Sequence, residues 1–220
     1  MGSNIKKRII TSLFLISLLS LMFFYTYIMI ISVIIISIIT WIEFYALISK
    51  IFKKNITKHK ILRFFCKSIS LFYLSALVYL IFIIESDHLN LKVYLLYSIL
   101  IAIMSDIGGL VFGKILKGKK LTKISPNKTI SGSIGSLIFS MLLTPFIYKT
   151  VFNVNLLSIF IITILISIVS QFGDLFISFL KRKAKVKDTS DILPGHGGIL
   201  DRIDGIIFAI PVGMFLFIII

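Results

Sequence analysis

NLLSIFIITILISIVSQFGDLFISFL, residues 155–180, is the stretch that decides the fold. Its apolar residues run on without the period-two alternation of a strand, and a helix that crosses a bilayer needs about 20 of them. Two basic residues, Lys181 and Arg182, follow at once. The stretch therefore predicts a transmembrane helix, although one acid, Asp174, lies within it.

Further apolar runs accompany this one along a chain of 220 residues that is 58% hydrophobic. The first two predicted spans share one apolar stretch and form a tight hairpin. The first run is interpreted as a retained anchor, because no small-residue cleavage site follows it. The expected fold is an all-α polytopic membrane protein with about seven transmembrane helices. They are predicted at about 9–25, 27–48, 64–84, 91–113, 132–150, 155–180 and 203–220.

Lysine and arginine are distributed unevenly among the loops. With the amino terminus inside, 22 of the 24 basic residues fall on the inner side, and only Lys92 and Lys149 fall outside. Such a bias orients helical membrane proteins. It predicts a multi-pass protein of the cell inner (plasma) membrane whose amino terminus and two long polar loops are cytoplasmic. It also accounts for most of the net charge of +15, so nucleic acid is not an expected partner.

Glycine and proline divide the chain. Of 13 glycines only Gly2 precedes residue 108, and all four prolines stand at or after residue 126. Plain helices suit anchoring, whereas glycine and proline permit turns, close backbone approaches and broken helices. We therefore assign residues 1–104 to membrane anchoring and packing, and residues 105–220 to the catalytic membrane region.

Three acids stand deep inside predicted spans. Glu43, Asp106 and Asp174 each precede a cytoplasmic lysine by seven or eight residues. At 1.5 Å per residue they lie roughly 10–12 Å below the helix end, a depth at which charges usually face a wet cavity or a bundle interior. We expect a polar cavity open to the cytoplasm, with Glu43 either lining it or pairing with a nearby lysine. Glycines beside Asp106 and Asp174 indicate the close approach of a bulky group.

The first polar loop is GKILKGKKLTKISPNKTISGS, residues 113–133. Lysines and backbone N–H groups at the start of a helix form an anion site. We expect Lys128 to contact phosphate, and Ser131 or Ser133 to cap the following span. Other lysines, such as Lys117, need only set the topology and attract anionic headgroups.

The second polar loop is KVKDTSDILPGHGGILDRIDG, residues 185–205. Asp201 and Asp204 are three residues apart at the start of the last predicted span and so share a helix face, where two carboxylates can hold Mg²⁺ together with substrate phosphates. His196 lies among glycines that let the backbone wrap an anion. A zinc site is not expected, because one histidine without a nearby cysteine provides too few ligands.

The segment from Ser178 to Asp204 resembles the signature of the phosphatidate cytidylyltransferase, or CDP-diacylglycerol synthase, family. SDIGGLVFGK, residues 105–114, resembles the family's Asp-x-x-Ala-Tyr-x-x-Gly-Lys segment, and SPNKT resembles its Ser-Pro-Lys-Lys-Thr. The chain departs from the pattern at 109–110, where Gly-Leu replaces Ala-Tyr, and at 130–131, where Ile-Ser replaces Trp-Glu. The signature positions present are Ser178, Leu180, Lys181, Arg182, Lys187, Asp188, Ser190, Leu193, Pro194, His196, Gly197, Gly198, Asp201, Arg202 and Asp204.

The resemblance implies that CTP and phosphatidic acid give CDP-diacylglycerol and pyrophosphate with Mg²⁺, in phospholipid biosynthesis. A second cation, monovalent or divalent, and a homodimer are further expectations. The implied catalytic residues are Asp174, Asp201, Asp204, Lys187, Asp188 and His196, with Asp174, Asp201 and Asp204 as metal ligands. The implied substrate-binding residues are Asp106, Lys114, Ser125, Lys128, Thr129, Lys181, Arg182, Gly197, Gly198 and Arg202.

Two other functions remain alternatives. A CTP-dependent lipid-alcohol kinase, acting on polyprenol or phytol, would need a base for its hydroxyl acceptor and would lack the full signature. A non-enzymatic, cation-coupled transporter would be expected to show repeat symmetry and charges on a path to both faces. The phosphate of phosphatidic acid is already ionised at pH 7, so the cytidylyl transfer needs no strong general base, which suits a loop with one histidine.

Overall fold

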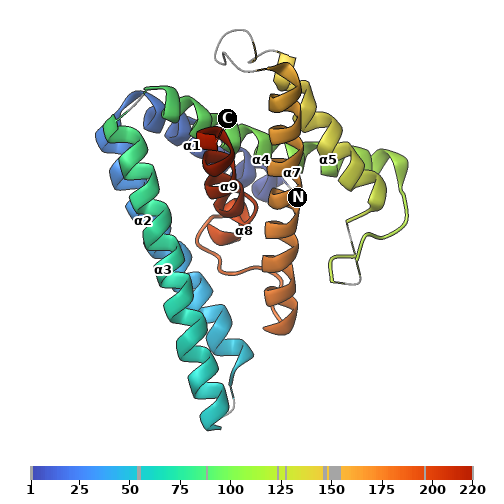
Figure 1. The fold of residues 1–220 in the computed structure, drawn as a ribbon. Helices are drawn as coiled ribbons and strands as arrows, with labels where there is room; N and C mark the ends of the chain where they lie inside the picture. The colour runs from blue at the N-terminus through green and yellow to red at the C-terminus, as the bar shows by residue number, and fades with distance from the viewer. Residues whose placement is uncertain are drawn as a thin grey trace. The chain divides into compact units, whose positions relative to one another are not determined.

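The structure, a computed structural model, describes residues 2–53, 56–87, 89–122, 124–126, 128–145, 148, 155–195 and 197–219. Its regular elements are helices, as predicted, and Figure 1 shows their course. They are α1 (Gly2–Phe24), α2 (Thr26–Ile51), α3 (Thr57–Asp87), α4 (Leu89–Leu116), α5 (Ile130–Leu142), α7 (Leu156–Lys183), α8 (Leu200–Ile203) and α9 (Ile206–Ile219).

Membrane-spanning length separates these helices into two groups. Within the described residues, five segments are long and apolar enough to cross a membrane: Thr26–Ile51, Thr57–Ile84, Leu91–Leu116, Leu156–Lys183 and Leu200–Ile219. The other two predicted spans correspond to shorter apolar helices, Ile9–Phe24 and Ile130–Leu142. The latter's 13 residues reach about 20 Å, less than the roughly 30 Å hydrocarbon core. The predicted span at 132–150 runs on into residues that lie mostly outside the described ones. The chain is thus a helical, multi-pass membrane protein.

The chain forms two compact units. Unit 1 comprises Met1–Glu85 and Leu180–Ile203, and unit 2 comprises Ser86–Phe179 and Asp204–Ile220. Each unit therefore combines residues from both halves of the sequence. The assignment of 1–104 to anchoring and 105–220 to catalysis is a division by function, and it stays a prediction.

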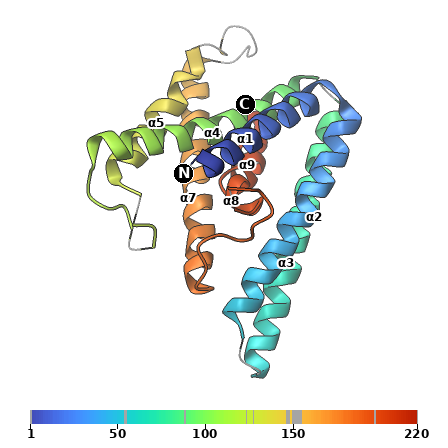
Figure 2. The same cartoon turned by 180° about the vertical axis from the view of Figure 1, so that it is seen from behind.

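In unit 1, α1 and α2 pack against each other, and α2 also contacts α8. Between these two helices only Tyr25 is non-helical, and its backbone is extended, with φ −122° and ψ 108°. The predicted hairpin between the first two apolar runs is thereby confirmed. The helices α2 and α3 then run antiparallel, side by side, as Figures 1 and 2 both show.

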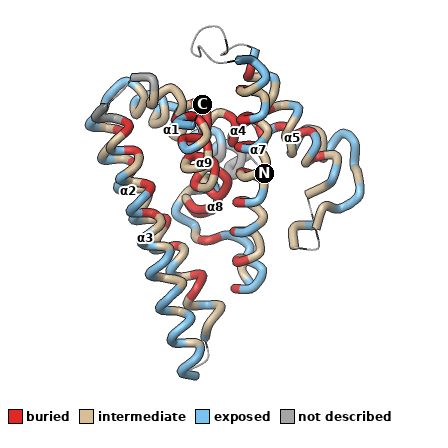
Figure 3. The backbone as a smooth tube through the Cα atoms, in the orientation of Figure 1, coloured by how far each residue is buried: buried red, intermediate tan, exposed pale blue. Residues whose placement is uncertain are grey.

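In unit 2, α4 packs on α5 and on α9. Glycines make the first contact close: the carbonyl oxygen of Gly135 stands where Gly108 would place a Cβ, and Gly109 meets the hydroxyl of Ser136. Buried hydroxyls add hydrogen bonds, for example Tyr97 to Thr163 at 2.7 Å. Small residues and such hydroxyls are the usual means by which helices associate in membranes. Buried residues are denser along α9 than along α2 and α3 (Figure 3).

Candidate active site

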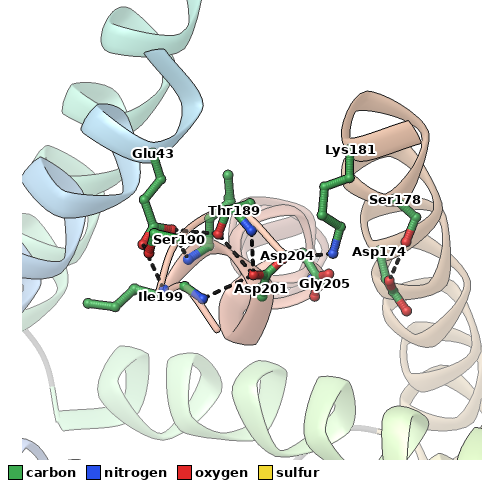
Figure 4. Close-up of polar contacts among 12 residues, drawn as sticks. Glu43, Asp174, Ser178, Lys181, Thr189, Ser190, Ile199, Asp201, Asp204 and Gly205 are labelled. Carbon is green, nitrogen blue, oxygen red and sulfur yellow. Dashed lines mark hydrogen bonds and ion pairs between the residues drawn. The ribbon is translucent and has the colours of Figure 1, made fainter. Parts of the chain in front are cut away.

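Glu43 organises the second polar loop from its place on α2. Its side chain is 2% exposed and accepts hydrogen bonds from four groups of the described chain. The hydroxyls of Thr189 and Ser190 donate at 2.9 and 2.5 Å, and the backbone N–H groups of Ile199 and Leu200 donate at 3.1 and 2.8 Å (Figure 4). The last two are N–H groups that the start of α8 leaves without helical partners. One carboxylate therefore holds both ends of the loop.

This arrangement corrects the sequence-based expectation for Glu43. It does not line an open cavity, because it is buried and enclosed by donors, and the groups that donate to it are not lysines. Sequence reasoning left Glu43 and Thr189 out of the candidate site. The available signal was the cost of an acid within an apolar run, which demands a partner. The partner itself lies 146 residues away, which no local pattern could indicate.

Asp201, on α8, forms a second centre in the same loop. Its Oδ2 accepts from the Thr189 backbone N–H at 2.8 Å and from the Gly198 N–H at 3.0 Å, and it shares the single hydroxyl proton of Thr189, at 2.9 Å, with Glu43. Its Oδ1 pairs with the Lys181 ammonium at 2.7 Å (Figure 4). The two side chains are 4% and 13% exposed. Asp201 thus joins the end of α7 to the loop.

The glycines of the PGHGG turn have distinct roles. A Cβ at Gly198 would lie 2.6 Å from Glu43 Oε2 and would collide with the Thr189 hydroxyl. Gly195 and Gly197 have φ of +79° and +83°, a region that favours glycine. The Leu193 N–H donates to the Gly197 carbonyl at 2.9 Å, which closes the turn. The glycine-rich turn that was predicted to bind an anion is therefore present, but the Gly198 N–H donates to a carboxylate of the chain itself, that of Asp201.

A separate polar group belongs to unit 2. The Lys128 ammonium forms an ion pair with Asp174 Oδ2, and the Ser178 hydroxyl donates to Asp174 Oδ1 at 3.3 Å. The Lys128 and Asp174 side chains are 28% and 22% exposed, so water reaches both. The residue predicted to bind phosphate is thus paired with a predicted metal ligand.

The lysine-rich loop presents Lys128 on an ordered turn. The Lys128 N–H donates to the Ser125 carbonyl at 3.1 Å, and the Leu121 N–H donates to the Lys128 carbonyl at 2.8 Å. Thr129 then caps α5, since its hydroxyl accepts from the Gly132 N–H at 3.0 Å. The prediction that Ser131 or Ser133 caps this helix is wrong. An extended residue must precede the first helical turn, and that residue is Thr129.

Asp204 lies in a break between two helices. Because α8 ends at Ile203 and α9 begins at Ile206, the prediction that one continuous helix face carries Asp201 and Asp204 is wrong. Asp204 is 6% exposed, and its Oδ1 accepts from the Gly205 N–H at 3.0 Å. A Cβ at Gly173 would lie 2.7 Å from the Asp204 carbonyl oxygen, so Asp174 and Asp204 stand on adjacent segments of unit 2.

The remaining candidates are more scattered. Glycine beside acid does mark a close approach, but at Gly108 and Gly173 the approaching group is a neighbouring helix. His196 lies outside the described residues. Ser125 and Gly197 are half-buried. The exposed candidates are Asp106, Lys114, Arg182, Lys187, Asp188 and Arg202.

Carboxylate oxygens are the ligands that Mg²⁺ prefers, and it often binds one or two of them together with substrate phosphates. The described residues contain no group of three His, Cys, Asp or Glu side chains that could hold a metal. Asp174 and Asp204, on adjacent segments of unit 2, are of the residue type that such a two-ligand site uses. Asp201 has its oxygens engaged by four donors of the chain. Its role as a metal ligand stays a prediction.

Comparison with known proteins decides the family. A sequence model of the cytidylyltransferase family matches residues 3–220. The chain belongs to the cytidylyltransferase family. The signature resemblance is thereby confirmed.

Individual members of the family match part of the chain. A phosphatidate cytidylyltransferase of Staphylococcus haemolyticus (strain JCSC1435) is 44% identical over 129 residues, which cover 58% of this chain and 48% of that protein. The protein of the same name from Staphylococcus aureus (strain COL) is 45% identical over 120 residues, covering 54% and 46%. The chain thus spans about half the length of these cytidylyltransferases.

Proposed function

We propose that this cytidylyltransferase-family chain transfers the cytidylyl group of CTP to phosphatidic acid. A phosphate oxygen of phosphatidic acid attacks the α-phosphorus of CTP, and the bond from that phosphorus to the β-phosphate breaks. The products are CDP-diacylglycerol and pyrophosphate. The observation that carries the proposal is the 44% identity with a phosphatidate cytidylyltransferase, together with the family match over residues 3–220.

The Lys128–Asp174 pair supports a role in substrate binding. Ion pairs that water reaches contribute little stability, about 0–1 kcal/mol. Lys128 can therefore replace Asp174 by another anion at a small cost in free energy. We infer that Lys128 leaves Asp174 for a phosphate of CTP. A charge-assisted bond to phosphate is stronger than a neutral one and neutralises part of the substrate's charge. Alignment of two anionic reactants requires this kind of neutralisation.

The loop held by Glu43 and Asp201 supports a positioning role. Buried carboxylates that are fully hydrogen-bonded rigidify the backbone around them. The loop presents Lys187 and Asp188 on its exposed side, and we propose that these two contact substrate. The catalytic role of His196 remains part of the proposal through the signature alone.

Magnesium fits the carboxylates of unit 2. Asp174 and Asp204 would hold it together with substrate phosphates, and Mg²⁺ there would withdraw electron density from the phosphoryl group and neutralise the leaving pyrophosphate. A second cation, monovalent or divalent, also belongs to the proposal.

The orientation proposed for the chain places both loops in the cytoplasm, where CTP is dissolved. The support is the bias of 22 among 24 basic residues. In a Cys66→Ser background, Lys119→Cys should react with impermeant maleimide only after the membrane is opened. Labelling in intact cells would reverse the orientation.

The activity is tested with the purified chain, CTP and Mg²⁺. Phosphatidic acid should give pyrophosphate and CDP-diacylglycerol, whereas polyprenol or phytol should give neither product. Formation of CDP with a phosphorylated alcohol would instead identify a lipid-alcohol kinase. If phosphatidic acid gave no release of pyrophosphate, the proposed function would be wrong.

A further inference from the structure

A groove in unit 1 lies between α2 and α3 and has a volume of about 360 Å³. One wall is formed by α2 through Trp41 and Tyr45, which are one helical turn apart. The other wall is formed by α3 through the basic residues Lys60, Arg63 and Lys67. None of these five residues belongs to the signature segment or to the lysine-rich loop.

The basic residues form one continuous stripe. Lys60, Arg63 and Lys67 are spaced by three and four residues, which places them on one face of α3. The Lys67 ammonium lies 3.1 Å from the centre of the Tyr45 ring, and the Trp41 indole N–H donates to the Lys67 carbonyl at 3.4 Å. These contacts tie the stripe to the aromatic wall.

Arg63 carries an unsatisfied donor within this stripe. Its Nη2 donates to the Phe52 carbonyl, whereas its Nε is buried and has no hydrogen-bond partner among the described residues. A buried N–H without an acceptor costs about 1–3 kcal/mol. Arg63 also lines the groove, so a phosphate there would meet its positive charge, although the buried Nε itself stays out of reach.

The charge around the groove is of one sign. Between Glu43 and Glu85 the sequence has seven basic residues and no acid. Glu43 lies two residues from Trp41 and two from Tyr45, about 200° around the helix from each, and it is enclosed by the signature loop. The groove is therefore complementary to an anion.

The position of the groove along α3 indicates a membrane ligand. Lys60, Arg63 and Lys67 occupy the first turns of the apolar segment Thr57–Ile84, and Leu71 lines the groove one turn further in. Tryptophan, tyrosine and basic side chains concentrate at the level of lipid headgroups. Exposed Phe64 and Leu71 continue the wall toward acyl chains. The gradient from basic to apolar matches a lipid's headgroup and chain.

We propose that this groove binds the phosphate headgroup of an anionic phospholipid, at a site separate from the one that binds CTP. The headgroup phosphate lies against Arg63 and Lys60, with Lys67 held beside it over the Tyr45 ring. The same α2 helix holds the signature loop through Glu43 on its opposite side, so the bound lipid steadies the helix that carries the loop.

Trp41 makes the proposal measurable because it is the chain's single tryptophan. The full chain is placed in nanodiscs of phosphatidylcholine and phosphatidylglycerol at fixed composition, with bromine on the acyl chains of one lipid or of the other. Brominated phosphatidylglycerol should quench Trp41 fluorescence several-fold more strongly than brominated phosphatidylcholine. Equal quenching by the two would overturn the proposal.

Variants distinguish a built site from general attraction of anionic lipid. Lys60→Gln and Arg63→Gln should each reduce the preference for phosphatidylglycerol over phosphatidylcholine roughly fivefold, because one basic residue at the interface contributes about that much to the binding of anionic lipid. Lys58→Gln, an equal change of charge on an exposed residue of α3 that does not line the groove, should leave the preference unchanged. Equal losses in all three variants would show only general electrostatics and would overturn the site. Exposed Lys60 keeps the test valid if Arg63→Gln fails to fold.

A final arm separates lipid phosphate from free phosphate. Inorganic phosphate at millimolar concentration should not remove the preference for phosphatidylglycerol. If it does, the groove binds a soluble phosphate and the lipid assignment is wrong. Phosphatidylglycerol is not a substrate of the proposed reaction, and no turnover is measured. The lipid site and the cytidylyl transfer can therefore fail independently.

Discussion

Two groups of charged residues in this chain differ in their burial and in the kind of partner they have. In unit 1, Glu43 is buried and the Asp201 side chain is 4% exposed, and both accept several hydrogen bonds, mostly from neutral donors of one loop. In unit 2, Asp174 and Lys128 form an ion pair that water reaches. Removal of an acceptor from a buried, saturated network leaves its donors unsatisfied, whereas a half-buried pair that water reaches separates at a smaller cost. The first arrangement maintains structure, and the second leaves its groups available to a ligand.

Asp174→Asn should have the largest effect, and the effect should fall on activity. Loss of an oriented electrostatic group costs about 10²–10³ in rate, or roughly 3–4 kcal/mol. Thermal stability should change little, because water reaches the half-buried pair with Lys128. Pyrophosphate release and a melting curve of the detergent-purified protein measure both quantities.

Extra Mg²⁺ should rescue Asp174→Asn only in part. Asp191→Asn makes the same chemical change on an exposed residue of the second loop and should keep its activity. Near-normal turnover of Asp174→Asn, with unchanged Mg²⁺ dependence, would place Asp174 with the structural residues.

Glu43→Gln should act through stability. An amide has one acceptor oxygen and presents N–H donors toward donors, so the free energy of unfolding should fall by about 3 kcal/mol. Helical signal followed against temperature measures this change, and activity should fall with the folded fraction. If Glu43→Gln lost turnover but melted like the wild type, Glu43 would act in chemistry and the contrast between the two groups would disappear.

Lys128→Ala should raise the KM for CTP roughly tenfold, because the variant loses one charge-assisted hydrogen bond to the substrate. Lys117→Ala, an exposed lysine in the same loop, should leave the KM unchanged. Initial rates over a range of CTP concentrations provide the comparison. Small, equal changes in both variants would reduce the loop to a surface patch.

Thr189→Val should have the smallest effect. Its hydroxyl lies 2.9 Å from both Glu43 and Asp201 but has one proton, so it satisfies one of them at a time. The free energy of unfolding should fall by about 1 kcal/mol, the value of one hydrogen bond. A loss equal to that of Glu43→Gln would show that Thr189, rather than the carboxylate, maintains the loop.

Local features were predictable wherever the physics is local. The helical class follows from apolar run length and is confirmed, and the break predicted between residues 25 and 27 lies at Tyr25. The cap of α5 was placed two to four residues too late, because Thr129, Ser131 and Ser133 are all capable caps and only backbone geometry selects among them. The break between α8 and α9, which separates Asp201 from Asp204, was missed, and Gly205 within it packs closely against Ser170.

The sequence by itself determined that the chain is a helical membrane protein of the cytidylyltransferase family, because hydrophobic length and a dense motif are properties of consecutive residues. Only the tertiary structure decided which groups each acid meets. Glu43, the one acid in α2, accepts from hydroxyls and amides that lie 146 to 157 residues later in the chain. Asp174 pairs with a lysine that lies 46 residues earlier. A carboxylate's role depends on the donors and the water around it, and folding, rather than sequence neighbourhood, supplies both.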